Sequence, residues 1–103
     1  MSGPLSGRYA LITGAEAGLG FAIADALAAA GASIIMHCLH ANDAARNAQK
    51  VLSSTRGVQV WLEQADLRNA DDIEALMQRT LDAIPRVDIV VNNAVIRHFE
   101  PAH

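Results

Sequence analysis

The stretch Ala10–Ala32 reads ALITGAEAGLGFAIADALAAAGA, with glycines at positions 14, 18 and 20 between two apolar runs. Residues 9–13 predict a short buried strand, and apolar residues at helical spacing from Leu19 to Ala30 predict a helix that Gly31 ends. Glycine contributes no side chain to a core and lowers the stability of regular structure. Three glycines at a strand-to-helix junction therefore indicate a turn with an unusual backbone or a close neighbour.

The rest of the chain repeats this alternation of strand and helix. We expect strands at 33–38, 58–64 and 87–93, a helix at 43–53 that Gly57 ends, and a helix between the N-cap Asn69 and Pro85. The expected core faces of these two helices comprise Ala44, Ala45, Ala48, Val51 and Leu52, and then Ile73, Leu76, Met77, Leu81 and Ile84. This alternation predicts an α/β fold, a Rossmann-like doubly wound parallel sheet whose first four strands lie in the order 3-2-1-4.

Composition limits the class of protein. The chain has 103 residues, enough for one domain or part of one, and 51% of them are hydrophobic. A net charge of −3 without a basic run argues against a nucleic-acid partner. No apolar run reaches the ~18 residues of a membrane span, and the N-terminus lacks a secretory signal run. The single cysteine, Cys38, cannot form an internal disulfide, so we expect a reduced, cytoplasmic setting.

The glycine turn has a chemical interpretation. An open parallel sheet binds nucleotides where its strands end, and a helix N-terminus offers free N–H groups to phosphates. Gly14 would form the tight turn, Gly18 would let a pyrophosphate approach the backbone, and Gly20 would let the helix pack on the strand. No Lys-Ser/Thr pair follows, so this is not a triphosphate-binding loop. A tight turn without a ligand is the alternative.

Three ordered motifs resemble those of the short-chain dehydrogenase/reductase family. They are TGAEAGLG at 13–20, ADL at 65–67 and NNAV at 92–95. The resemblance implies an NAD(P)-dependent oxidoreductase that transfers hydride between nicotinamide and an alcohol or carbonyl substrate. It also implies that a pyrophosphate is surrounded by Gly14, Gly18, Leu19 and Gly20.

The same resemblance assigns the other cofactor contacts. Asp66 would accept a hydrogen bond from the adenine amino group with Leu67 beside the ring, although an exposed turn carboxylate is the alternative for Asp66. Asn93 and Ala94 would line the ribose on the nicotinamide side. Val95 departs from the family pattern, which has a glycine there.

The stretch NNAVIRHFEP is similar to that of the 3-hydroxybutyrate dehydrogenases of this family. It makes Arg97 a candidate for binding a substrate carboxylate, with a solvated surface arginine as the alternative.

The choice between NAD and NADP depends on the end of the second strand. An acidic residue there binds the ribose 2′-hydroxyl of NAD, and a nearby arginine accepts the 2′-phosphate of NADP. By resemblance these positions fall at Cys38 and Leu39, and neither has the expected chemistry. Glu16 in the glycine turn would repel a 2′-phosphate, so we favour NAD. His40 and Asn42 could still contact a 2′-phosphate, so NADP remains the alternative.

Two further features of the sequence could be mistaken for functional sites. HCLH at 37–40 suggests a metal cluster, but adjacent strand residues point to opposite faces and no second ligand pair exists, so we expect polar residues at a strand end and no metal. Trp61 is expected to pack on a face of the sheet.

The family's catalytic Tyr-x-x-x-Lys is absent, since the only tyrosine is Tyr9 and the only lysine is Lys50. The apolar fourth strand would be an edge, yet it has the pattern of a strand with neighbours on both sides. We interpret residues 1–103 as a partial dinucleotide-binding domain without catalytic residues, inactive alone, from an enzyme that is a homo-oligomer when complete. The alternatives are a non-catalytic nucleotide-binding or interaction module, and another doubly wound protein such as a methyltransferase with an adenosyl cofactor.

Overall fold

The computed structural model describes residues 3–93, which form four strands and three helices. In chain order these are β1 (Tyr9–Ile12), α1 (Gly18–Ala29), β2 (Ser33–Cys38), α2 (Asp43–Arg56), β3 (Val60–Gln64), α3 (Ala70–Ala83) and β4 (Ile89–Val91). The alternation expected from the sequence is therefore confirmed. In these residues no helix is long and apolar enough to cross a membrane.

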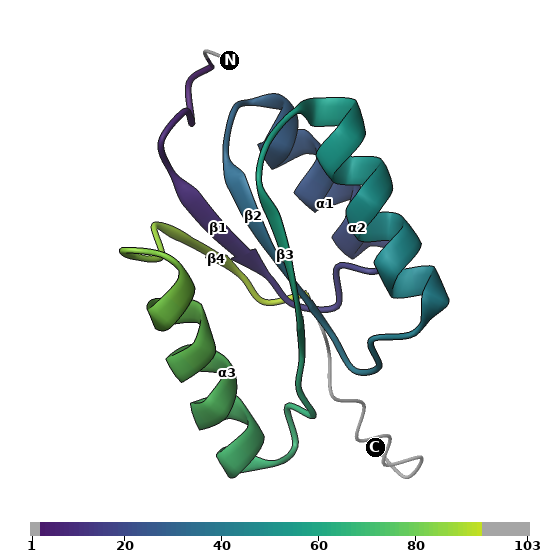
Figure 1. Cartoon of the computed structure of the whole chain (residues 1–103), viewed down its shortest axis with the longest axis vertical. Helices are drawn as coiled ribbons and strands as arrows, with labels where there is room; N and C mark the ends of the chain where they lie inside the picture. Colours follow the sequence, from purple (N-terminus) through teal and green to yellow (C-terminus); the bar gives the residue numbers. More distant parts are fainter. Residues whose placement is uncertain (1–2, 94–103) are drawn as a thin grey trace, which may run out of the picture.

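The strands form one parallel sheet in the order β3-β2-β1-β4, as expected. Helices α1 and α2 cover one face and α3 covers the other (Figure 1). All four strands end at the same edge of the sheet, so the segments that follow them gather there. That edge carries the glycine turn.

Side chains alternate between the two faces along each strand. The face under α1 and α2 is packed by a cluster that includes Ile12, Ile34, Met36 and Leu52. The face under α3 has a smaller core of Leu11, Ile35 and Ile84, with Tyr9 and Trp61 packed against it. The rings of Tyr9 and Trp61 lie 6.3 Å apart, so the expected position of Trp61 on a face of the sheet is confirmed.

The expected core faces of the helices were partly wrong. Along α3 only Leu76 and Thr80 are buried, together with Ile84 just after the helix, whereas Ile73, Met77 and Leu81 are 40%, 36% and 53% exposed. The helix meets the sheet along one narrow line, and no element of residues 3–93 covers its apolar flank. The Thr80 hydroxyl donates to the Leu76 carbonyl (2.8 Å), which satisfies the one polar side chain on that line.

Similar differences occur in the other elements. Ala44 and Val51 of α2 are exposed. Helix α2 runs one turn beyond the expected end, to Arg56, before Gly57 caps it at φ 68°. Strands β3 and β4 are shorter than expected, because Val60 is the first residue of β3 to pair with β2 and Val91 is the last of β4 to pair with β1.

Strand β4 is an edge strand among the described residues, because its only ladder partner there is β1. Val90 is 63% exposed on the α3 side. The start of the strand is held by Asp88, whose carboxylate accepts the Tyr9 N–H at 2.9 Å and pairs with Arg8 and Arg86. An apolar edge held only at one side is open to pairing with another strand.

Candidate functional site

The glycines of the turn have distinct structural reasons. Gly14 and Gly18 have φ of 62° and 61°, a left-handed backbone that disfavours any side chain. A Cβ added at Gly20 would collide with the Gly14 carbonyl oxygen and lie 2.6 Å from Asn93 Nδ2, whereas a Cβ at Gly18 would meet nothing within 4 Å. Gly20 thus serves internal packing, and Gly18 leaves open space beside the turn.

The N-terminus of α1 differs from those of the other two helices. Helices α2 and α3 are capped by the side chains of Asn42 and Asn69 and carry aspartates in their first turns. Helix α1 has Ala17 at its N-cap, no side-chain cap and no acidic residue in its first turn. Its first N–H groups and positive dipole end therefore have no side-chain acceptor of the kind that caps the other two helices, and such an end attracts anions. Leu19, in the first turn of the same helix, is 70% exposed.

Asp66 lies just after β3 and is held by Arg68. Asp66 Oδ1 accepts hydrogen bonds from the backbone N–H and Nε of Arg68, both at 3.0 Å, and Oδ2 accepts one from the guanidinium at 2.9 Å. These bonds lower the pKa of Asp66 to about 2, the side-chain bond most of all. A carboxylate has about four acceptor positions, so one on Oδ2 remains for a donor such as an adenine amino group. Leu67, the next residue, is half-buried.

The end of β4 touches the glycine turn directly. Asn93 Nδ2 donates to the Gly14 carbonyl at 3.2 Å, and the Thr13 hydroxyl donates to Asn92 Oδ1 at 3.2 Å. The structure therefore brings the first and third motifs together. Ala94, Val95 and Arg97 lie outside the described residues.

The end of β2 is less polar than a ribose site requires. Cys38 is fully buried with Sγ 3.7 Å from the Glu63 carbonyl, and burial, followed by the nearby Glu16 carboxylate, raises the pKa of its thiol to about 11. A buried neutral thiol cannot meet a ribose hydroxyl, so only the backbone of Cys38 is available at this edge. Leu39 is 43% exposed.

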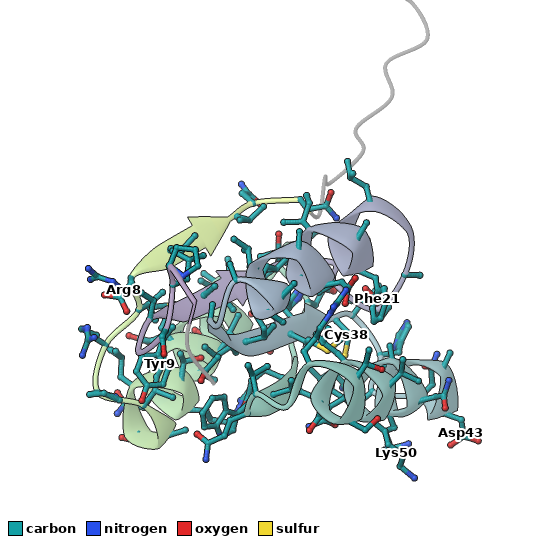
Figure 2. All side chains as sticks on the ribbon, turned by 90° about the horizontal axis from the view of Figure 1, so that it is seen from above. Arg8, Tyr9, Phe21, Cys38, Asp43 and Lys50 are labelled. Carbon is teal, nitrogen blue, oxygen red and sulfur yellow. The ribbon has the colours of Figure 1, made fainter. Side chains whose placement is uncertain are left out.

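Glu16, in the glycine turn, lines a cavity that the turn shares with α2. This cavity of about 290 Å³ is lined by Glu16, Gly18 and Phe21 and by Ala44, Asn47 and Val51 of α2. Figure 2 shows Phe21 and Cys38 at the same side of the molecule.

His37 is a residue of this edge that the sequence reasoning missed. It is 2% exposed, and its ring bonds both to the Gly14 N–H (3.0 Å) and to the Ala65 carbonyl (2.9 Å). No sequence signal separates this role from that of a polar residue at a strand end. Among residues 3–93, no group of three or more His, Cys, Asp or Glu side chains is arranged to hold a metal ion.

The tyrosine and the lysine lie away from this edge. Tyr9 begins β1, at the opposite end of the strand from Gly14, and the Arg86 guanidinium sits 5.7 Å from its ring centre. Figure 2 shows Tyr9 far from Phe21 and Cys38, with Lys50 pointing outward from α2. Neither can act on a substrate at the carboxyl ends of the strands.

These observations define a Rossmann-like α/β protein with a glycine turn and an uncapped helix N-terminus after its first strand. Residues 8–103 match the family model of the short chain dehydrogenases, and the chain belongs to that family.

Relatives and solved structures agree with the family. The chain is 39% identical over 94 residues to the D-beta-hydroxybutyrate dehydrogenase of Cupriavidus necator, covering 91% of this chain and 36% of that protein. It is 37% identical over 92 residues to a 3-oxoacyl-[acyl-carrier-protein] reductase of Synechocystis, covering 89% and 37%. The L-sorbose reductase of Gluconobacter frateurii, solved with NADPH and L-sorbose, superposes with a TM-score of 0.85 at 32% identity, covering 92% and 36%. The chain thus spans little more than a third of these proteins.

We expect Gly20→Ala to destabilise the fold. The new methyl group would press on the Gly14 carbonyl and on Asn93 Nδ2, and overpacking of this kind costs about 1–3 kcal/mol. Urea unfolding of the intact protein measures the loss. Adding Asn93→Ala removes one of the two collisions and should recover part of the stability. An unchanged unfolding midpoint in Gly20→Ala would contradict the close packing.

Proposed function

We propose that residues 1–103 are the cofactor-binding part of an NAD(P)-dependent oxidoreductase that interconverts an alcohol and a carbonyl compound. The observation that carries the proposal is the glycine turn, where open space at Gly18 meets the uncapped N-terminus of α1. The test is oxidation of NADH by the intact protein with a panel of ketones and 3-oxo acids. Absence of binding of both NADH and NADPH would overturn it.

In this proposal each residue of the edge has a separate task. The N–H groups at the start of α1 hold the pyrophosphate, with Gly14, Gly18, Leu19 and Gly20 around it. Asp66 accepts the adenine amino group at its free position on Oδ2, with Leu67 beside the ring. Asn93 and Ala94 line the nicotinamide ribose, next to Val95. The cofactor, when bound, supplies or accepts the hydride.

We also propose that NAD is preferred to NADP. Burial is the main cause of the raised pKa of the Cys38 thiol, and the nearby Glu16 carboxylate is the second. Glu16 therefore lies close to the end of β2. Cys38 and Leu39 offer no cation at that end. A carboxylate there would repel the 2′-phosphate of NADP, and NAD has no such group. Among the solved relatives, the L-sorbose reductase was solved with NADPH, so the preference needs its own test.

We expect Glu16→Arg to strengthen NADPH binding. The change removes one repulsion and adds one charge-assisted partner for the 2′-phosphate, so we expect about tenfold tighter binding. Calorimetric titration of both proteins with NADPH measures it. Glu74→Arg, the same charge reversal on exposed α3, should leave the affinity unchanged. Tighter binding of NADPH than NADH by the unaltered protein would contradict the preference.

The substrate in this proposal is a small alcohol, ketone or 3-hydroxy acid. The relative from Cupriavidus necator is a hydroxybutyrate dehydrogenase by name, and Arg97 is our candidate partner for a substrate carboxylate. We further propose that the complete enzyme is a homo-oligomer in the cytoplasm. A non-catalytic nucleotide-binding module is the second candidate, favoured by the distance of Tyr9 and Lys50 from the glycine turn. It would bind NADH without any turnover in the intact protein.

A further inference from the structure

His37 joins two segments that are far apart in the sequence. It lies in β2, next to the last residue, and its side chain is buried between the ends of β1 and β3. The Gly14 N–H donates to Nδ1 at 3.0 Å, and Nε2 lies 2.9 Å from the Ala65 carbonyl oxygen. One ring thus bonds to the glycine turn and to the residue before Asp66.

The partners determine the state of the ring. Gly14 N can only donate, so Nδ1 must be an acceptor, and the Ala65 oxygen can only accept, so Nε2 must carry the proton. Only the neutral tautomer with the proton on Nε2 satisfies both bonds. A protonated ring would turn an N–H toward the Gly14 N–H and break the link to the turn.

Main-chain hydrogen bonds also join the end of β2 to the turns after β1 and β3. The Ala15 N–H donates to the His37 carbonyl at 3.0 Å, and the Ala65 N–H donates to the Cys38 carbonyl at 3.1 Å. The ring therefore reinforces main-chain bonds that fix where the turn after β1 stands relative to the turn after β3.

Charged groups on the neighbouring elements are already engaged. Glu63, the register partner of His37 on β3, pairs with Arg79 of α3 at 2.6 Å. Asp66 pairs with Arg68 at 2.9 Å, and Asp72 of α3 accepts the Asp66 N–H. Glu16 is the ionisable residue of the glycine turn, and β1 brings the uncharged Thr13 to this end. Within residues 3–93, no carboxylate is hydrogen-bonded to the imidazole to hold it protonated.

We propose that neutral His37 is a positioning residue for the dinucleotide, setting the spacing between the pyrophosphate turn and Asp66 on the adenine side. The inference rests on the proposed function, because it concerns how the same cofactor is held. It makes NADH affinity depend on the hydrogen bond between this side chain and the Gly14 N–H.

The test compares His37→Asn with the unaltered intact protein. Asparagine places an oxygen near the position of Nδ1, so it can accept from Gly14 at any pH. We expect His37→Asn to bind NADH about as tightly as the unaltered protein, because it keeps the bond to Gly14. His37→Leu, which lacks both bonds, should bind about tenfold more weakly. Thr80→Val, a control at a buried polar residue of α3, should leave the NADH affinity unchanged.

The outcomes separate the two proposals. Failure of the unaltered protein to bind either NADH or NADPH would overturn the proposed function itself. Binding by the unaltered protein, with equally weakened binding in His37→Asn and His37→Leu, would overturn only the role of His37, because the bond to Gly14 would then make no difference. A folded His37→Leu that binds NADH as tightly as the unaltered protein would do so too. If His37→Leu does not fold, the affinity of His37→Asn still decides, because about tenfold weaker binding despite the retained bond to Gly14 would overturn the role.

Discussion

Gly18→Val is expected to abolish NADH binding while the protein stays folded. A Cβ at this position would meet no protein atom within 4 Å, so the valine methyls would occupy the space assigned to the pyrophosphate. Hydrogen bonds to charged groups contribute about 1.5–3 kcal/mol each. Loss of two of them predicts at least about 100-fold weaker binding, measured by calorimetric titration of the intact protein.

The backbone provides a matched control. Gly18 has φ 61°, and a residue with a side chain in that conformation costs about 1–2 kcal/mol. Gly57 has φ 68° and also has nothing within 4 Å of an added Cβ, but it caps α2 at the opposite edge of the sheet. Gly57→Val should therefore lose similar stability and keep its NADH affinity. Equal NADH affinity in Gly18→Val and the unaltered protein would refute the dinucleotide turn.

The order of the strands could be predicted because few topologies satisfy a strand–helix alternation. Each crossover is right-handed, and the doubly wound arrangement then leaves 3-2-1-4 for the first four strands. The glycine turn could be predicted equally well, because glycine alone readily adopts φ values such as the 62° of Gly14 and the 61° of Gly18. A left-handed backbone conformation at one position requires glycine at that same position, so the sequence alone can predict it.

What could not be predicted depends on contacts between distant residues. The exposure of Met77 and Leu81 depends on how α3 is rotated against the sheet, which its apolar pattern alone does not fix. The pairing of Asp66 with Arg68 is local, but arginine is not part of the motif that singled out Asp66. His37 required knowledge that Gly14 and Ala65 stand on either side of the β2 end. Sequence patterns predict the apolar periodicity of helices and strands and the positions of turns. Hydrogen bonds between residues far apart in the sequence can be identified only from the structure.

Residues 1–103 prepared by themselves are expected to show no turnover. Tyr9 lies at the wrong end of β1 and Lys50 points outward from α2 (Figure 2), so neither can exchange a proton with a substrate beside the glycine turn. Loss of general acid–base catalysis alone lowers a rate by about 10²–10⁴-fold, and loss of substrate orientation lowers it further. NADH oxidation, followed by nicotinamide absorbance with ketones and 3-oxo acids, measures the rate against that of the intact enzyme.

The same preparation is expected to self-associate through β4. Val90 is 63% exposed on this apolar edge strand, and Met77 and Leu81 are exposed on α3. Val90→Lys places a charge on the edge, which natural sheets use against strand pairing, so it should reduce light scattering without creating activity. That variant separates the two causes of inactivity: if aggregation alone silenced the enzyme, a monomeric Val90→Lys preparation would turn over substrate. Turnover by such a monomer would show that residues 1–103 already contain the acid–base group, and would overturn the proposal that they are only the cofactor-binding part.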